Sequence, residues 1–277
     1  MSSNNWLSPN LSDGLGNRLF QVAAAQAAAI KYNRPLVFFL PRCHKASHCS
    51  AATLFKLFPS VPIMEVGTTQ WTEISEQAFA TYEPLPPTIP VGPIVLKGFR
   101  QSPKYFSTDL EIPLDFEAAL GKERMKALHL RWISNSRSSG KTAFLHIRLG
   151  DYRILPHHQL NLESYWVESL SRLGKKSPRL LVFSDEPSQA IIMAPFFKQF
   201  GLRSVEVVED CDPIESLYLM SLCDGGAVCA NSTFSWWGAY LSKTRRDRVS
   251  QIFMPSRWGE GLVAPDIYPE WATVIQI

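Results

Sequence analysis

The second half of the chain alternates short apolar strands with single helices, and this alternation restricts the possible folds more than any other feature. The expected strands lie at Thr142–Ile147, 179–183, 205–208, 227–229 and 251–254. Strands joined by one helix each form right-handed crossover units, in which the strands run parallel. We therefore predict an α/β fold with a doubly wound parallel sheet.

The segment 205–241, VEVVEDCDPIESLYLMSLCDGGAVCANSTFSWWGAYL, contains two helix starts. Asp212 is a predicted N-cap, Pro213 occupies the first turn, and Glu215 completes a capping-box pattern. The turn 231–235, NSTFS, ends a buried strand and begins a helix, so its hydroxyl and backbone N–H groups favour an anion. The alternative is that these hydroxyl groups only cap the helix.

Three strands end in polar residues that should share the carboxyl edge of the sheet, where open α/β folds bind ligands. These residues are His146 and Arg148, Ser184 and Asp185, and the turn 231–235. The planar guanidinium of Arg148 suits a phosphate. An ion pair with Asp151 is a compatible alternative, since Asp151 could orient Arg148. Because the chain lacks a GxxxxGK[ST] phosphate loop, we predict a nucleotide-diphosphate site without a Walker motif.

The first half of the chain contains a glycine turn, DGLGNRLFQ, before an alanine-rich helix. Gly14 and Gly16 allow a tight turn and close backbone approach to a ligand. Leu19 stands where a dinucleotide fingerprint needs a third glycine, so NAD binding is not predicted.

Other elements are expected as strands at 35–40 and 94–99 and as a helix at 115–136. The polar loop NSRSSGK follows that helix. It predicts a boundary between an N-terminal domain, residues 1–138, and a C-terminal domain, residues 139–277.

The composition argues against wholesale disorder and against nucleic acid as a partner. Hydrophobic residues make up 45% of the 277 residues, and the net charge is +3. The N-terminus lacks a secretory apolar region, and no apolar run approaches the ~18 residues of a membrane span. Five cysteines without a disulfide-like spacing fit a reducing compartment. We expect a cytoplasmic protein without a membrane span.

Two short patterns could hold a metal ion, and both have simpler explanations. The segment 43–49, CHKASHC, lacks the second pair of ligands that a zinc site needs. The segment 210–212, DCD, has the form of a D-x-D motif, but Asp212 already serves as an N-cap. We predict no metal ion and no cofactor.

Several motifs resemble, in order, those of glycosyltransferase family 11, the α-1,2-fucosyltransferases. They are GLGNRLFQVAAAQAAA, GFRQSPKYF, HIRLGDY, LVFSDEP and LYLMSLCDGGAVCANSTFSWWGAYL. The resemblance implies a GT-B-like architecture, in which two Rossmann-type doubly wound domains face each other across a cleft. It places the nucleotide sugar on residues 139–277 and the acceptor on residues 1–138. It also implies an inverting, metal-independent transfer of L-fucose from GDP-fucose to the 2-hydroxyl group of a galactoside.

The resemblance also assigns roles at matching positions. Arg148 would contact the diphosphate, Asn17 would face the donor and the acceptor, and Asp151 completes the predicted catalytic set. His146 and Glu215 would contact the nucleoside, with the capping box as the alternative for Glu215. The full predicted donor-binding set is Gly14, Gly16, His146, Arg148, Ser184, Asp185, Glu215, Asn231, Ser232, Thr233, Phe234 and Ser235.

A GDP-sugar and a glycan acceptor are therefore the predicted partners, and acceptor binding is predicted at Tyr105 and His158. Leu149 departs from the family pattern, HxRRGD, and removes one positive charge. This departure keeps open a different donor or acceptor. A nucleotide-sugar or glycan-binding module without turnover is a separate alternative. The general base is left open among Asp13, Asp151, His157, His158 and Glu163, and so is the oligomeric state.

Overall fold

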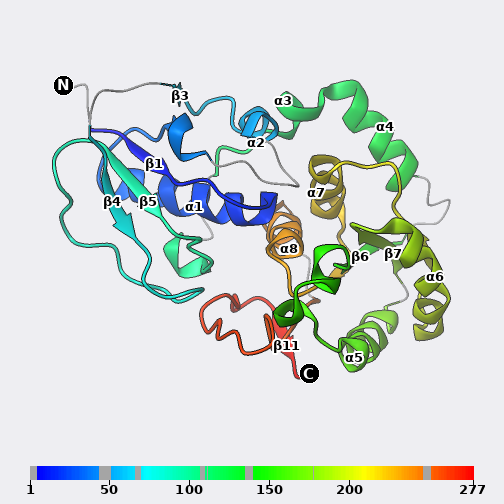
Figure 1. Cartoon of the computed structure of the whole chain (residues 1–277). Helices are drawn as coiled ribbons and strands as arrows, with labels where there is room; N and C mark the ends of the chain where they lie inside the picture. The colour runs from blue at the N-terminus through cyan, green and yellow to red at the C-terminus, as the bar shows by residue number, and fades with distance from the viewer. Residues whose placement is uncertain are drawn as a thin grey trace. The chain divides into compact units, whose positions relative to one another are not determined.

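The computed structural model describes residues 5–43, 51–65, 70–106, 110, 112–134, 140–176, 178–245 and 251–277. Contacts group the chain into two compact units (Figure 1). The first unit is Met1–Ala119 with Ala264–Pro269, and the second is Leu120–Val263 with Glu270–Ile277. The boundary predicted between residues 138 and 139 lies outside the described residues and stays a prediction.

The second unit is built on a six-stranded parallel sheet with the order β11-β10-β9-β6-β7-β8. Its strands are β6 (Thr142–Ile147), β7 (Arg179–Ser184), β8 (Ser204–Val207), β9 (Gly226–Val228), β10 (Ile252–Pro255) and β11 (Thr273–Ile275). Strand β6 is entirely buried and lies between β9 and β7. The parallel α/β organisation predicted for this half of the chain is confirmed.

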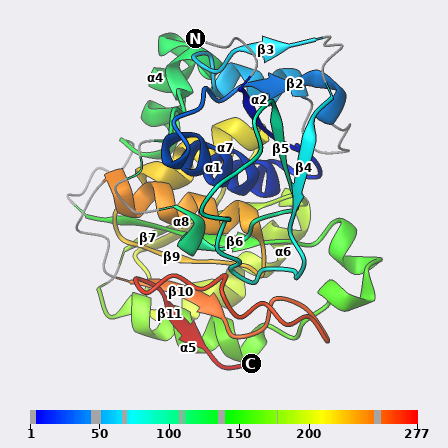
Figure 2. The ribbon, with the colours of Figure 1, turned by 90° about the vertical axis from the view of Figure 1, so that its left-hand side faces the viewer.

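Helices cover both faces of this sheet. They are α5 (Glu163–Gly174), α6 (Pro187–Phe197), α7 (Pro213–Leu222) and α8 (Thr233–Arg245), while α4 (Lys122–Trp132) packs against α7. Alternation along β6 sends Leu145 and Ile147 into a core shared with α5 and α6. It sends His146 to the opposite face, where its ring lies 5.5 Å from Phe234 of α8. Figure 2 shows α7 and α8 on one side of the sheet and α5 on the other.

The first unit contains smaller parallel sheets. A three-stranded sheet has the order β1-β5-β4, and β2 pairs with β3. These strands are β1 (Leu7–Pro9), β2 (Phe38–Phe39), β3 (Ile63–Met64), β4 (Thr72–Ser75) and β5 (Ile94–Lys97). The helices are α1 (Leu15–Lys31), α2 (Ala51–Leu57) and α3 (Phe116–Leu120), of which α3 ends at the division between the units. Ala25 and Ala28 of α1 pack closely on Leu7 and Ile94, which explains the alanine-rich sequence of this helix.

Two predicted elements differ from the structure. The helix expected at 115–136 is divided into α3 and α4, because Gly121 adopts a φ of 76° between them. The strand expected at 35–40 is reduced to Phe38–Phe39, which pairs with the equally short β3, while Leu36 forms an isolated bridge with Leu7 of β1.

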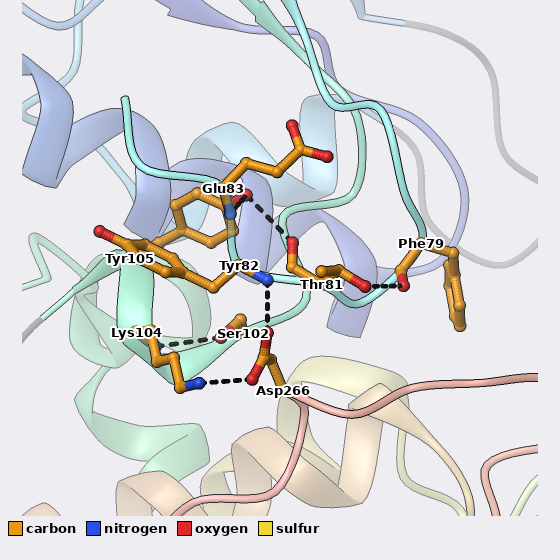
Figure 3. Close-up of polar contacts among 8 residues, drawn as sticks. All are labelled: Phe79, Thr81, Tyr82, Glu83, Ser102, Lys104, Tyr105 and Asp266. Atoms are coloured by element: carbon orange, nitrogen blue, oxygen red, sulfur yellow. Dashed lines mark hydrogen bonds and ion pairs between the residues drawn. The ribbon is translucent and has the colours of Figure 1, made fainter. Parts of the chain in front are cut away.

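The segment Ala264–Pro269 belongs to the first unit although it follows almost all of the second in sequence. Asp266 attaches it there: its carboxylate accepts the N–H of Tyr82 at 2.7 Å and pairs with Lys104 (Figure 3). The backbone N–H of Asp266 also donates to the carbonyl oxygen of Ala80 at 3.1 Å. The first unit is therefore completed by residues from near the end of this sequence.

Candidate functional site

The three polar strand ends predicted from the sequence are neighbours in the sheet of the second unit. Ile147, the last residue of β6, pairs with Ser184 at the end of β7. On the other side of β6, Leu145 pairs with Val228 of β9. Because these strands are parallel, Arg148, Asp185 and Asn231 all follow them at the carboxyl edge.

Arg148 is held between two carboxylates at this edge. Its Nε donates to Asp151 Oδ1 at 3.0 Å, and its Nη2 lies 2.8 Å from the same oxygen. On the other side, Nη1 lies 3.2 Å from Asp185 Oδ2. The side chain is 20% exposed, so the guanidinium is oriented by the protein and still reaches solvent. The ion pair predicted between Arg148 and Asp151 is present.

Asp185 also fixes the loop that carries Arg148. Its Oδ1 accepts the backbone N–H of Leu149 at 2.9 Å. Its Oδ2 is so close to Gly150 that a Cβ there would lie 2.5 Å from it. The hydroxyl of Ser184 accepts the N–H of Glu186 at 3.1 Å and shapes the start of α6. The contacts of Asp185 and Ser184 are thus with protein groups, and donor binding by these two residues stays a prediction.

His146 is a neutral histidine inside the protein. It is 3% exposed, and its Nδ1 has no hydrogen-bond partner among the described residues. Burial, with a smaller contribution from the Arg148 charge, lowers the pKa of His146 to about 3. A neutral imidazole can exchange hydrogen bonds with a nucleoside but cannot attract the diphosphate by charge.

The turn 231–235 caps α8 as the alternative interpretation predicted. The Ser232 hydroxyl accepts the Phe234 N–H at 3.3 Å, and the Ser235 hydroxyl accepts the Ala230 N–H at 3.1 Å. Asn231 Nδ2 donates to the carbonyl oxygens of His158 at 3.3 Å and Trp258 at 3.1 Å. Thr233 begins the helix. An anion at this turn, including donor contacts from residues 231–235, stays a prediction.

The start of α7 has the predicted capping box. Asp212 accepts the N–H of Glu215 at 2.9 Å, and Glu215 accepts the N–H of Asp212 at 2.9 Å. Glu215 also accepts a hydrogen bond from Arg124 Nε at 2.5 Å, and this partner holds the pKa of the Glu215 carboxyl below its usual range. Within the described ranges no group of His, Cys, Asp and Glu side chains has the arrangement of a metal site. Residues 44–49 of the CHKASHC pattern lie outside them.

Four predicted site residues belong to the first unit. Gly14 is the N-cap of α1, and a Cβ added there would meet nothing within 4 Å. Gly16 and Asn17 lie in the first turn, where Asn17 Oδ1 accepts a hydrogen bond from Gln101 Nε2 at 3.0 Å. Tyr105 is buried, and its hydroxyl accepts the backbone N–H of Glu83 and donates to the carbonyl oxygen of Thr81 (Figure 3). It also accepts a hydrogen bond from Arg100 Nη1. These contacts indicate a structural function for Tyr105, while its predicted role in acceptor binding remains untested.

The sequence interpretation did not single out Tyr152, which contacts several site residues. The Arg148 guanidinium carbon lies 5.6 Å from the centre of its ring, and its hydroxyl donates to the Asn231 carbonyl at 2.9 Å. The His158 ring stacks on it at 4.4 Å. The one available signal was that Tyr152 directly follows Asp151 in the HIRLGDY motif.

Comparisons with known proteins identify the family of this chain. A model of glycosyl transferase family 11 matches residues 89–255, more than half of the chain. The chain belongs to glycosyl transferase family 11. The resemblance seen in its motifs is thereby confirmed, and membership of this family supports glycosyltransferase activity.

Two relatives from Escherichia coli are similar to this family 11 chain. An α-1,2-colitosyltransferase is 25% identical over 256 residues, which cover 83% of this chain and 86% of the relative. The O-antigen biosynthesis glycosyltransferase WbnK is 31% identical over 129 residues, covering 44% of this chain and 41% of WbnK. The second match therefore extends over less than half of the relative.

The structure is similar to that of NodZ α-1,6-fucosyltransferase co-crystallised with GDP, with a TM-score of 0.55 at 13% identity. The match covers 91% of this family 11 chain and 94% of NodZ. This likeness supports the α/β fold class. No helix in the described part of the chain is long and apolar enough to cross a bilayer.

Proposed function

We propose that this protein is an inverting glycosyltransferase that moves L-fucose from GDP-fucose to the 2-hydroxyl group of a galactoside without a metal ion. The observation that carries the proposal is Arg148, a permanent positive charge held at the carboxyl edge of the sheet between Asp151 and Asp185. Membership of family 11 and the α-1,2-linkage in the name of one relative support the reaction class.

In this mechanism the acceptor hydroxyl attacks the anomeric carbon from the face opposite GDP. The bond from that carbon to the diphosphate oxygen breaks, the hydroxyl proton leaves to a base or to water, and the diphosphate gains negative charge. Arg148 would stabilise that charge. Nη2 pairs with Asp151 and Nη1 with Asp185, but each of these nitrogens carries a second N–H that could donate to a phosphate oxygen.

The residues proposed for this reaction divide into two groups. Arg148, His146 and the turn 231–235 would bind GDP on the second unit, where Asp151 orients Arg148. Gly14, Gly16 and Asn17 would act from the start of α1 in the first unit. In the DCD segment the Asp212 carboxylate accepts the Glu215 N–H, so helix capping explains this residue without a metal ion.

A second donor is favoured by a specific observation. The relative that covers most of this chain is named as an α-1,2-colitosyltransferase. Colitose is L-fucose without its 3-hydroxyl group, so one site could accept either sugar. A panel of GDP-fucose, GDP-colitose and GDP-mannose with a galactoside acceptor would identify the transferred sugar by the mass of the product.

The first test is calorimetric binding of GDP and UDP, in EDTA and again with Mn²⁺. Tight binding of GDP in EDTA supports the proposal. Binding that requires Mn²⁺ would refute the metal-free mechanism, and a preference for UDP would refute the donor. Transfer from GDP-fucose to a galactoside then tests turnover.

The residue test is Arg148→Ala, which should lower turnover by ~10²–10³ because it removes a charge stabilising the leaving group. Arg153→Ala is the matched control, since Arg153 lies in the same loop but pairs with Glu186 at 3.0 Å. The control should keep turnover within about threefold of the original protein, as expected for an exposed ion pair. Near-native turnover of Arg148→Ala would refute the role given to Arg148.

A further inference from the structure

Tyr152 joins two strand ends that the sequence leaves far apart. It lies in the short helical turn Asp151–Arg153 after β6, and its hydroxyl donates to the carbonyl oxygen of Asn231 after β9 at 2.9 Å. Burial raises the pKa of Tyr152 to about 12, so the phenol stays protonated and can donate throughout the physiological range. The hydroxyl is therefore a permanent link between the two segments.

The ring of Tyr152 contacts the guanidinium of Arg148. The two lie 5.6 Å apart from guanidinium carbon to ring centre, within the range of a cation–π interaction. Asp151 and Asp185 bind the edges of the guanidinium, as described above. Hydrogen bonds to its edges hold the guanidinium within its own plane. The ring contact restrains movement out of that plane.

A closed set of contacts fixes the ring itself. His158 stacks on Tyr152 at 4.4 Å with an angle of 9° between the ring planes. The backbone carbonyl of His158 accepts a hydrogen bond from Asn231 Nδ2 at 3.3 Å. Tyr152, His158 and Asn231 thus each contact the other two, so a shift of any one disturbs both other contacts.

We propose that Tyr152 is a positioning residue of the diphosphate site. Its ring orients the guanidinium of Arg148, and its hydroxyl keeps the Arg148 loop in register with the turn 231–235. This inference rests on the proposed function, because it assumes that both segments meet one diphosphate. It predicts that the hydroxyl and the ring of Tyr152 contribute separately to GDP affinity.

Two substitutions separate these contributions. Tyr152→Phe removes the link to Asn231 and keeps the ring, and it should weaken GDP binding about fivefold, as expected for one neutral hydrogen bond. Tyr152→Leu also removes the contact with Arg148 and should weaken binding about tenfold to thirtyfold. Both affinities are measured by calorimetry, beside the unfolding temperature of each variant.

Tyr165→Phe is the matched control. Tyr165 is buried in α5, and its hydroxyl donates to the carbonyl oxygens of Cys229 at 2.7 Å and Phe253 at 2.8 Å. This variant therefore loses a similar bond to the end of β9 without touching Arg148. It should lower the unfolding temperature and leave GDP affinity unchanged. Equal losses of affinity in Tyr165→Phe and Tyr152→Phe would reduce Tyr152 to a structural residue and overturn the proposal.

A measurement without ligand distinguishes failure of this inference from failure of the proposed function. The Nε–H resonance of Arg148 is assigned by its absence in Arg148→Lys. Because the guanidinium lies over the Tyr152 ring, the ring current is expected to shield this proton. It should move downfield in Tyr152→Leu and stay in place in Tyr165→Phe. If the original protein does not bind GDP, the proposed function fails, and the resonance still decides whether Tyr152 positions Arg148. An unmoved resonance overturns the inference even if GDP binds tightly.

Discussion

Replacing His146 with glutamine should reduce the loss of stability that acid causes. The imidazole is buried in β6 against Phe234 and near the positive charge of Arg148. Its pKa falls from 6.5 to about 3 in the folded protein. Between these values the unfolded chain binds a proton that the folded protein does not. The contribution of neutral His146 is therefore complete above about pH 6.5 and is lost progressively as the pH falls.

The size of this effect follows from the pKa difference. Each pH unit between the two values corresponds to about 1.4 kcal/mol of unfolding free energy. At pH 5 the unfolding free energy of the original protein should be about 2 kcal/mol lower than at neutral pH because of His146. Glutamine does not titrate, so His146→Gln should lack this part of the loss. Carboxylates contribute equally to both proteins and cancel in the difference.

The assay is urea unfolding of both proteins at pH 7.5, 6.5, 5.5 and 5.0. Ile147→Val is the matched control, because it perturbs the opposite face of the same strand without changing a titrating group. The unfolding free energy of the Ile147→Val control should be about 1 kcal/mol lower than that of the original protein at every pH. The stability gap between His146→Gln and the original protein should shift by about 2 kcal/mol from pH 7.5 to pH 5. If the difference in unfolding free energy between the two proteins stays constant with pH, the conclusion that His146 is buried and neutral is refuted.

Two further substitutions test the loop that carries Arg148. Gly150→Ala should weaken GDP binding about threefold to tenfold in calorimetry, because its Cβ would lie 2.5 Å from Asp185 Oδ2 and displace that partner of Arg148; unchanged affinity would show that Asp185 is not needed. Leu149→Arg should lower the unfolding free energy by about 1–3 kcal/mol, because Leu149 packs against the core shared with α5 and α6. The GDP affinity of the Leu149→Arg variant should change less than threefold. A tenfold gain in affinity would contradict the conclusion that the side chain at position 149 points to that core.

The sequence predicted the second unit well because its signals are local. The capping box of Asp212 and Glu215 depends on residues three positions apart and is present as expected. The meeting of Arg148 with Asp185 follows from parallel strands and single-helix connections, which bring strand ends to one edge. Both inferences required only the order of elements and the chemistry of their ends.

Features that depend on distant partners could not be predicted in this way. The apolar run 35–40 has the composition of a full strand, but only Phe38 and Phe39 pair with β3, and Leu36 forms an isolated bridge with Leu7. Tyr105 and Arg100 lie in one family motif, but that motif does not specify the backbone groups of residues 81 and 83 that also bond the Tyr105 hydroxyl. Tyr152 was missed because its partners Asn231 and His158 come from other segments.

The attachment of Ala264–Pro269 to the first unit has a consequence for how the protein is made. A ribosome must complete residues 120–263 before it supplies Asp266, the residue that binds Tyr82 and Lys104. The first unit therefore cannot finish folding while it is the only part outside the exit tunnel. For the same reason, no single cut of the gene yields two fragments that each encode one whole unit.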